Sequence, residues 1–312
     1  MKALVTGATG YIGSELCRQL SAAGLAFVPL SAGGGTLAGG RATLSVDFRQ
    51  GAVAAELLEG VDVVYHLAGI AHQQAPAQLY AEINYRATLA LASAAERAGV
   101  RLFVFLSSVK AMGPAAGCAA RQESEVATPV GAYALSKWRA ECALREQFAG
   151  SAMTVVILRP ALVYGPCPRG NLQWLLRAAR WGLPLPPEGG ARSMVSNQDL
   201  AELLLLLPQE VQQGVHTWII TDGEAYTTRQ VYVLLREALG RSGERQLPAW
   251  CWRVLAAVLD ILRRQPPGSS FGKLFGAERY DNHALLRETR WRPRQTLASV
   301  APAMVARPVA AR

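Results

Sequence analysis

Short apolar runs alternate with helix-length segments over the first half of the chain. The runs are rich in β-branched and aromatic residues and predict six strands: Lys2–Thr6, Ala26–Ser31, Thr43–Phe48, Val61–Leu67, Arg101–Ser107 and Thr154–Arg159. Three longer segments between them have the length of helices: Tyr11–Ala23, Ala77–Ala98 and Ala132–Phe148. Such an alternation is typical of an α/β fold, a doubly wound parallel sheet with helices on both faces.

The rhythm changes after Val163, where loops rich in proline and glycine begin. A helix near Asp199–Leu207 and a strand at Thr217–Thr221 predict a return to the sheet, and helices near Gln230–Leu239 and Trp250–Arg263 follow. We therefore predict a sheet domain from residues 1–164 and 196–221. A smaller C-terminal domain comprises residues 165–195 and 222–312. One glycine-rich stretch, residues 33–40, is expected to be a flexible loop.

The composition agrees with a globular protein. The 312 residues are 51% hydrophobic and 18% charged, which supplies a core and excludes general disorder. No signal peptide is apparent, and the longest apolar stretches are shorter than the roughly 18 residues that a membrane span needs. Five scattered cysteines indicate neither a disulfide framework nor a metal site. We expect a cytoplasmic protein with no membrane span and no bound metal.

The formal net charge of +9 raises the question of nucleic acid. The basic residues are spread along the chain and match no nucleic-acid-binding motif, so we expect no nucleic-acid partner. An anionic small substrate explains the charge better. Only 4 of the 32 basic residues are lysines, so a lysine here indicates a place where arginine does not serve.

A glycine loop follows the first predicted strand and opens the first predicted helix. In Thr6-Gly7-Ala8-Thr9-Gly10-Tyr11-Ile12-Gly13, Gly7 permits a tight turn, Gly10 lets a pyrophosphate approach the backbone, and Gly13 lets helix and strand pack closely. The amides at the helix N-terminus, including those of Tyr11 and Ile12, then face the phosphates. The context of strand, turn and helix predicts a Rossmann-type dinucleotide-binding domain, as opposed to a plain turn without a ligand.

The end of the second predicted strand leaves the choice of cofactor open. An acidic residue there would bind the ribose hydroxyls of NAD, but this chain has Pro29-Leu30-Ser31-Ala32-Gly33, with neither an acid nor an arginine. Ser31 could hydrogen-bond a ribose hydroxyl or a 2′-phosphate. The cofactor is therefore NAD or NADP.

Further motifs occur in the order found in one known family. The TGxxGxxG loop resembles that of the extended short-chain dehydrogenase/reductases, in the NAD-dependent epimerase/dehydratase family, and the resemblance to its UDP-glucose 4-epimerase-like members covers essentially the whole chain. A late segment, Arg287–Pro293, resembles the R-E-L-G-W-x-P segment of nucleotide-sugar epimerases. The resemblance implies that further residues contact the cofactor: Asp47, Phe48, Leu67, Ala68, Gly69, Asn84, Pro160 and Val163. It also implies that the sheet domain binds NAD(P) and the smaller domain a nucleotide sugar.

Three residues form the candidate catalytic set. Tyr133 and Lys137 are four positions apart in a predicted helix, so their side chains leave the same face, and an ammonium near a phenol should lower the phenol's pKa. Ser108 ends the fifth predicted strand, at the sheet edge where ligands bind. In the family that the chain resembles, this serine holds the reacting sugar oxygen, the tyrosine transfers its proton, and the lysine also binds the nicotinamide ribose.

The two positions after Ser108 narrow the reaction. The 4,6-dehydratases of the family carry an Asp-Glu pair there, whereas this chain has Val109 and Lys110, so the acid and base for eliminating water are missing. Lys110 is itself a candidate substrate contact, with Ser108. The resemblance assigns Asn171 and Arg192 to substrate binding as well, with the Arg192 guanidinium on the diphosphate.

Two weaker substrate candidates are Lys273 and His72, and His72 could equally be an ordinary loop histidine. The expected substrate is a UDP-hexose that reacts at C4. The expected enzyme is a UDP-sugar 4-epimerase. An NAD(P)H-dependent reductase of a UDP-4-keto-6-deoxy sugar in surface polysaccharide synthesis uses the same triad, so that alternative stays open. A cofactor-binding regulator without catalysis is a remote third. A homodimer is compatible with the sequence, which does not define the oligomeric state.

Overall fold

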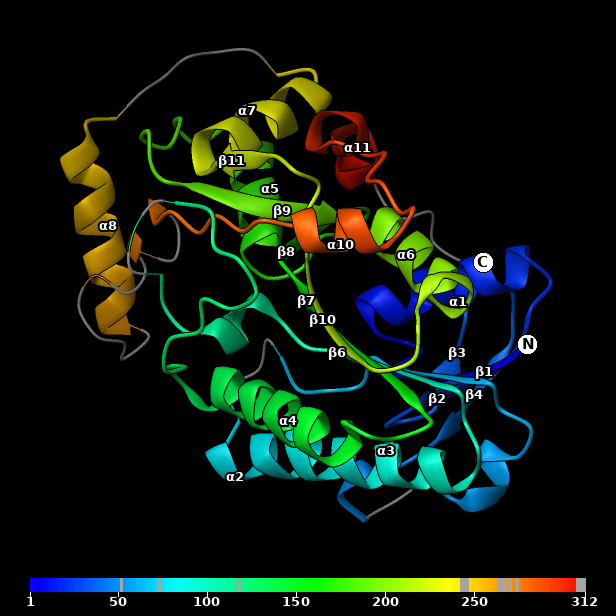
Figure 1. The fold of residues 1–312 in the computed structure, drawn as a ribbon. Coiled ribbons are helices and arrows are strands. Elements are labelled where there is room, and N and C mark those ends of the chain that lie inside the picture. The colour runs from blue at the N-terminus through cyan, green and yellow to red at the C-terminus, as the bar shows by residue number, and fades with distance from the viewer. Residues whose placement is uncertain are drawn as a thin grey trace.

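The computed structural model of the protein describes residues 1–50, 53–71, 75–115, 117, 119–241, 247–262, 268, 271–272 and 275–306. A large twisted sheet with helices on both faces forms one part, and a smaller group of strands and helices lies along one side of it (Figure 1). Within the described residues, no helix is long and apolar enough to cross a membrane.

The large sheet has eight strands in the order β10-β7-β6-β5-β1-β2-β4-β3. Their bounds are β1 Lys2–Thr6, β2 Ala26–Ser31, β3 Gly35–Thr36, β4 Ala42–Ser45, β5 Val63–His66, β6 Leu102–Leu106, β7 Thr154–Pro160 and β10 Val215–Ile220. All neighbouring pairs are parallel except β3 with β4. The chain runs from β1 to one edge and then returns through β5 to the other, so the strand order reverses between β1 and β5. Ligands of such sheets bind at this switch point.

Helices cover the two faces of the large sheet. One face carries α1 (Tyr11–Ala22) and α6 (Asn197–Glu210), and the other carries α3 (Ala87–Arg97) and α4 (Ala132–Phe148), seen below the sheet in Figure 1. Side chains of a strand alternate between the faces, so Val104 of β6 joins the core under α1 and α6, while Phe103 and Phe105 join the core under α3 and α4.

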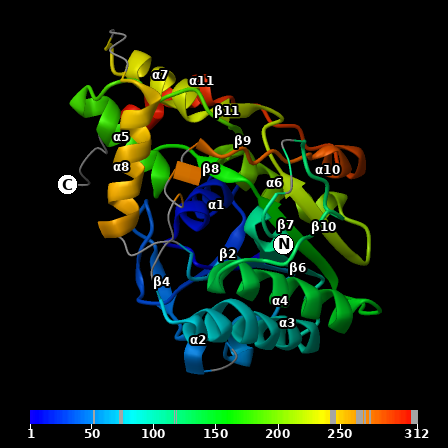
Figure 2. The same ribbon diagram turned by 90° about the vertical axis from the view of Figure 1, so that its left-hand side faces the viewer.

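The smaller part is built around a second sheet, in the order β11-β9-β8. It comprises β8 Leu162–Tyr164, β9 Ala191–Ser196 and β11 Ala225–Thr227, with helices α5 Asn171–Trp181, α7 Thr228–Ala238 and α11 Leu297–Val305. These elements enclose a third core. One more helix, α8 (Ala249–Leu262), stands at the outer edge of this part in both views (Figures 1 and 2).

Residues late in the chain pack into the core between the large sheet and helices α1 and α6. Leu285, in helix α10 (His283–Glu288), and Trp291 are buried among side chains of β1, α1 and α6. The Trp291 indole donates a hydrogen bond of 3.0 Å to the carbonyl of Asp199 in α6, and the amide of Gln295 donates to the Asp199 carboxylate. The last 30 described residues therefore help to complete the core under the large sheet.

The predicted α/β fold with a doubly wound parallel sheet is confirmed, and most predicted elements lie within a few residues of the observed ones. Three predictions differ. The segment Ala77–Ala98 is not one helix, because a π-helical stretch, Ala81–Arg86, separates α2 (Ala77–Tyr80) from α3. The strand predicted at Thr43–Phe48 ends at Ser45. The glycine-rich stretch forms the β3–β4 hairpin, in which Leu37 is buried.

Candidate active site

The three glycines of the first loop are required by close backbone contacts. Gly7 has a φ of +71°, and a Cβ on it would lie 2.8 Å from the Ala68 nitrogen. A Cβ on Gly13 would lie 2.1 Å from the carbonyl oxygen of Gly7, so a side chain there cannot fit. The loop therefore packs directly against the loop after β5, which brings the two predicted cofactor segments together.

The N-terminus of α1 fits a phosphate. Its N-cap residue, Gly10, offers no side chain, and the first turn holds no acid, whereas α6 and α7 are capped by the hydroxyls of Ser196 and Thr227. Uncapped amides at a helix N-terminus attract anions. Nearby, the Tyr11 hydroxyl and the Asn197 Oδ1 are buried without a hydrogen-bond partner among the described residues. Such unpaired polar atoms are expected where a polar ligand completes a site.

A chain of hydrogen bonds fixes the loop after β5. The His66 ring lies between two hydroxyls, with its Nδ1 2.8 Å from Thr6 Oγ1 and its Nε2 3.0 Å from Thr88 Oγ1. The Thr6 hydroxyl also accepts a bond from the Ala68 amide. Burial, helped by the charge of Lys137, lowers the pKa of His66 to about 3, so the ring is neutral at physiological pH. Sequence reasoning missed this histidine as a positioning residue, although it directly precedes the predicted cofactor residues Leu67, Ala68 and Gly69.

Asn84 connects the same loop to the catalytic helix. Its side chain accepts a hydrogen bond from the Ile70 amide and donates to the Ile70 carbonyl, and it also donates to the Ser136 hydroxyl of α4. A Cβ on Gly69 would lie 2.9 Å from the Asn84 Oδ1 and 3.3 Å from the Lys137 Nζ. The predicted residues Gly69, Asn84 and Lys137 therefore meet at one point.

The structure brings Ser108 and Tyr133 into contact. Ser108 follows β6 and caps a short 3₁₀ turn, Val109–Met112, and its side chain lies close enough to the Tyr133 hydroxyl to lower the pKa of that group by hydrogen bonding. The Tyr80 ring packs edge-on against the Tyr133 ring, with centroids 6.3 Å apart. A serine and a tyrosine joined in this way can bind one substrate oxygen between them and exchange a proton with it.

Lys137 is buried behind this pair. Its Nζ donates a hydrogen bond of 2.8 Å to the carbonyl of Leu106 and lies 4.5 Å from the centre of the Phe105 ring. Burial lowers the pKa of Lys137 to about 7, against a smaller opposing effect of Glu141. The same burial raises the pKa of Tyr133, and only the bond from Ser108 opposes it. The expected lowering of the tyrosine pKa by Lys137 is therefore wrong for the protein on its own, because burial has the largest effect and the Lys137 charge is not among the groups that act on Tyr133.

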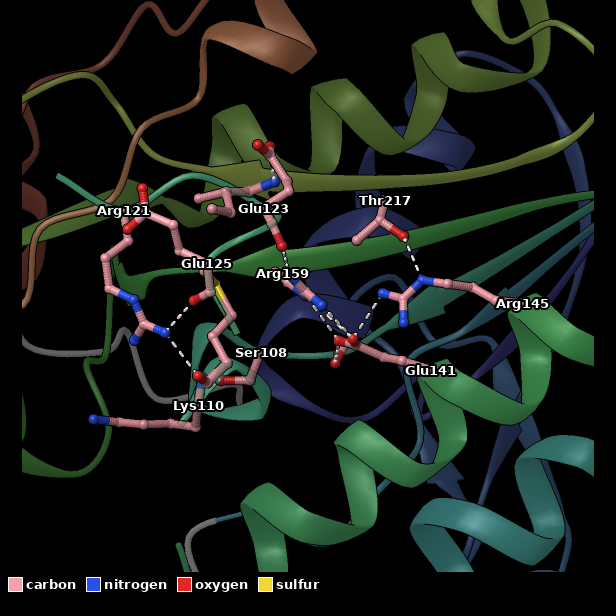
Figure 3. Close-up of polar contacts among 12 residues, drawn as sticks. Ser108, Lys110, Arg121, Glu123, Glu125, Glu141, Arg145, Arg159 and Thr217 are labelled. Atoms are coloured by element: carbon pink, nitrogen blue, oxygen red, sulfur yellow. Dashed lines mark hydrogen bonds and ion pairs between the residues drawn. The ribbon is translucent and has the colours of Figure 1, made fainter. Parts of the chain in front are cut away.

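A buried ion-pair network, not predicted from the sequence, lies one helical turn after Lys137 and is centred on Glu141 (Figure 3). The Glu141 carboxylate, one turn after Lys137, accepts bonds from the Ser107 hydroxyl and the Arg159 guanidinium, the latter at 2.7 Å. Arg145 reaches the same carboxylate from the outside. Glu141 and Arg159 are 0% and 1% exposed. An acid four residues after the lysine was the available sequence signal.

The other predicted cofactor residues lie in strands or directly after them. Ser31 is buried, and its hydroxyl is engaged by the Gly34 carbonyl and the Thr43 hydroxyl, both at 2.8 Å. Asp47 is ion-paired to Arg49, and Phe48 is buried with its ring edge-on to His66. Leu67 packs against the first core, Pro160 ends β7, and Val163 lies in β8.

Two of the predicted substrate residues lie in the smaller part. Asn171, the first residue of α5, and Arg192 of β9 line one pocket, together with apolar side chains and Tyr226. The Arg192 guanidinium is also a structural donor, because it binds the carbonyls of Gly272 at 2.7 Å and Gly276 at 3.0 Å. A bound diphosphate would share this guanidinium with the backbone.

Lys110 points away from Ser108, as Figure 3 shows, and its Nζ forms an ion pair with Glu278. Glu278 is also bridged to Arg192 through the backbone. Glu278 therefore joins two predicted substrate residues, Lys110 through its carboxylate and Arg192 through its backbone. The candidates His72 and Lys273 fall outside the described residues.

The parallel sheet with its glycine loop and the Ser108–Tyr133–Lys137 set define an extended short-chain dehydrogenase/reductase. The chain belongs to the NAD dependent epimerase/dehydratase family, whose model matches residues 3–221. It is 30% identical to a UDP-glucose 4-epimerase of Vibrio cholerae over 94% of this chain and 91% of that protein.

Two further relatives bear on cofactor and substrate. The structure of UDP-glucose 4-epimerase from Thermus thermophilus in complex with NAD matches with a TM-score of 0.74 and 25% identity, over 98% of each chain. An Escherichia coli protein described as N-acetyl-alpha-D-glucosaminyl-diphospho-ditrans,octacis-undecaprenol 4-epimerase is 27% identical over 60% of this chain and 57% of its own.

Proposed function

We propose that this chain is a UDP-sugar 4-epimerase that inverts C4 of a UDP-hexose with NAD as the hydride carrier. The observation that supports this most directly is the contact between Ser108 and Tyr133, with Lys137 behind it, at the switch-point edge of the sheet. The 30% identity to the Vibrio cholerae epimerase over nearly the full length also supports it.

The cofactor residues fit NAD. When bound, NAD supplies a nicotinamide ring that accepts a hydride from C4 and returns it. The uncapped N-terminus of α1 would hold the pyrophosphate, and the Lys137 ammonium would bind the nicotinamide ribose. NAD is proposed over NADP because the Ser31 hydroxyl, the one candidate contact at the end of β2 for a 2′-phosphate, is already engaged within the loop.

The protein's own groups move one proton in each half of the reaction. Tyr133 would act as the phenolate, a form that the positive charge of the nicotinamide ring of bound NAD would favour against the effect of burial. As hydride leaves C4, the phenolate oxygen takes the proton of the O4 hydroxyl, so C4 becomes a ketone while Ser108 holds O4 by a hydrogen bond. The keto sugar then turns about its diphosphate and presents its other face. Tyr133 returns its proton to O4 as hydride returns to C4, and the enzyme is restored.

Binding of the substrate is assigned to the smaller part. Residues 165–195 and 222–312 would hold the nucleotide sugar, and residues 1–164 and 196–221 the cofactor. Arg192 would bind the diphosphate, and Asn171, at the start of α5, would donate to it from the same pocket. The carbonyls of Gly272 and Gly276 keep the guanidinium in a fixed orientation, which lowers the entropy cost of that contact.

A second candidate substrate has the same sugar diphosphate attached to a polyprenol instead of uridine. The Escherichia coli relative is described as an epimerase of such a compound. The specific observation in its favour is the apolar outer face of α8, because a lipid-linked substrate must be reached at a membrane surface.

One panel of assays tests the proposal. The purified protein is incubated with UDP-glucose, UDP-N-acetylglucosamine, a UDP-4-keto-6-deoxy sugar and an undecaprenyl-diphosphate-linked N-acetylglucosamine, each with and without NADPH. Conversion of a UDP-hexose to its C4 epimer without added reductant is the expected result. Consumption of NADPH with the keto sugar would replace the proposal by the 4-ketoreductase, and turnover of the lipid-linked sugar alone would select the second candidate.

A further inference from the structure

The smaller part of the protein carries an unusual concentration of exposed apolar side chains. Among the described residues, fourteen large apolar side chains are exposed, and ten of them lie in α5, α8 or the chain next to these helices. These ten are Trp174, Trp181, Leu183, Leu247, Trp250, Val254, Leu255, Val258, Ile261 and Leu262. Contiguous apolar patches on a protein surface mark sites of interaction.

The exposed side chains of α8 lie on one face. With about 100° between successive residues of an α-helix, Trp250, Val254, Val258 and Ile261 fall within an arc of roughly 80°. Leu255, Ala257 and Leu262 widen it to roughly 160°, and Trp250 and Ile261 are 65% and 76% exposed. No charged residue lies within this arc. A helix that only covered a core would have the opposite arrangement, with polar residues outside.

A different face of α8 seats it on the protein. Ala256 and Asp260 are buried on that face. The Trp252 ring packs edge-on against Phe275, at 6.3 Å between centroids, and the Arg253 guanidinium lies 5.9 Å from the centre of the Phe271 ring. Because α8 packs on the protein through this second face, its apolar outer face stays exposed in the folded protein.

The segment that seats α8 also forms part of the substrate site. Phe271 and Phe275 contact α8 and each other, and between and beside them the carbonyls of Gly272 and Gly276 hold the Arg192 guanidinium. Phe271 and Phe275 therefore lie between α8 and Arg192, the residue that we assign to the diphosphate. A partner bound to the outer face of α8 would be close to the substrate site.

We propose that the outer face of α8 docks on an anionic lipid bilayer. The helix has 14 residues, about 21 Å in length, which is too short to span a membrane and suits a helix lying in its surface. Trp250 is the type of residue that anchors at the membrane interface. Arg253 borders the apolar arc, and Arg263 and Arg264 follow the helix in the sequence of a chain with a net charge of +9. Basic residues at this position attract anionic lipids.

A second copy of the chain fits this face less well. The apolar strip projects about 21 Å by 10 Å, on the order of 200 Å², whereas a stable protein interface takes roughly 800 Å² from each partner. Pairing two such faces would also bring the basic flanks of both copies together. The docking surface does not depend on the reaction proposed above, because its test measures binding and not turnover.

The test is co-sedimentation of the full chain with vesicles. One set is phosphatidylcholine with about one third phosphatidylglycerol, and the other is pure phosphatidylcholine. We expect most of the protein to sediment with the anionic vesicles, and about tenfold less with the neutral ones or in high salt. The double variant Val258→Asp/Ile261→Asp should lose binding about tenfold or more, because it places charge within the apolar arc.

A matched control variant is Leu44→Asp/Val126→Asp, which changes two other exposed apolar residues and should sediment like the wild type. Melting temperature and NAD affinity should be unchanged in both variants, which separates docking from folding. Wild-type protein that stays in solution with both vesicle types would overturn the proposal. So would equal binding by the α8 variant, or a wild-type dimer that the α8 substitutions dissociate.

Discussion

The ammonium group of Lys110 lies 2.6 Å and 2.8 Å from the two carboxylate oxygens of Glu278. This ion pair joins the turn that follows Ser108 to the segment that follows α8. Both side chains are partly exposed, and pairs of this kind contribute little to stability. Their effect on the charge of the substrate site is larger, since the Glu278 carboxylate is paired with Lys110 and the Glu278 backbone is bridged to Arg192.

Glu278→Gln should therefore favour an anionic substrate. Removing the carboxylate leaves the Lys110 ammonium without its negative partner, so we expect the KM for the nucleotide sugar to fall about two- to fivefold at low ionic strength. The gain should disappear at high salt, which screens exposed charges. Steady-state kinetics at two salt concentrations measure both effects, and a rise in KM would show that Glu278 helps to bind the substrate.

Tyr133→Phe should abolish turnover and leave NAD binding nearly intact. The substitution removes only the oxygen that exchanges a proton with O4, and such acid–base steps contribute about 10²–10⁴-fold to the rate. Turnover assays and NAD titration of the same preparation provide the two readouts. Tyr80→Phe, which alters the neighbouring ring without touching Ser108, is the matched control and should keep most of the activity.

The free energy of unfolding of the cofactor-free protein should rise with pH above about 7. Burial holds the pKa of Lys137 near 7 in the folded chain, below its ordinary value of 10.5, so the unfolded chain binds more protons between these values. Stability therefore increases with pH across that window, by up to about 1.4 kcal/mol per pH unit. Lys137→Met should remove this slope in denaturant titrations, whereas Lys110→Met should retain it.

Arg192→Ala should raise the KM for the nucleotide sugar by about 10–100-fold, the loss of a charge-assisted contact to phosphate. The Kd for NAD should hardly change, because the pyrophosphate of NAD is assigned to a separate site, the N-terminus of α1. Arg192→Lys should recover part of the loss, since a lysine cannot bind two carbonyls and a phosphate in one plane. Equal weakening of both ligands would instead indicate that the carbonyl contacts of Arg192 maintain the fold.

Glu141→Ala should be one of the most destabilising substitutions in the chain. It leaves the Arg159 guanidinium charged and buried without its partner, which costs about 3–5 kcal/mol. A double variant, Glu141→Leu/Arg159→Met, should recover most of that loss because it removes both charges and keeps the volume. Urea titrations of the three proteins measure the difference, and a single variant as stable as the wild type would mean that water reaches Arg159.

The sequence predicts the parts of the fold in which hydrophobic periodicity and glycine position agree. Seven of the eight strands of the large sheet and helix α4 were predicted within a few residues, the exception being β3. Gly7 and Gly13 meet the geometry that their motif requires. The small sheet was missed, because β8 and β11 have three residues each and their pairing joins segments far apart in the chain.

Within the site, the sequence did not show which side chains are buried or which groups the charged side chains pair with. Motif spacing identified Tyr133 and Lys137 but gave no indication that both side chains are buried. Burial raises the pKa of Tyr133, where the motif had suggested that it would be lowered. Spacing likewise identified Arg192 and Lys110 but not their carbonyl and carboxylate partners, since Gly272 and Glu278 follow 80 or more residues later. Long-range partners of this kind follow from tertiary structure alone.

The burial of Leu285 and Trp291 beneath the large sheet has a consequence for synthesis on the ribosome. Domains commonly fold as their N-terminal portions emerge, but here the core between β1, α1 and α6 lacks two of its members until residues 285–291 have been made. The nascent sheet therefore exposes an unfilled apolar surface until that stage. Chaperone protection before it, and intolerance of deletions that remove Trp291, are the expected results.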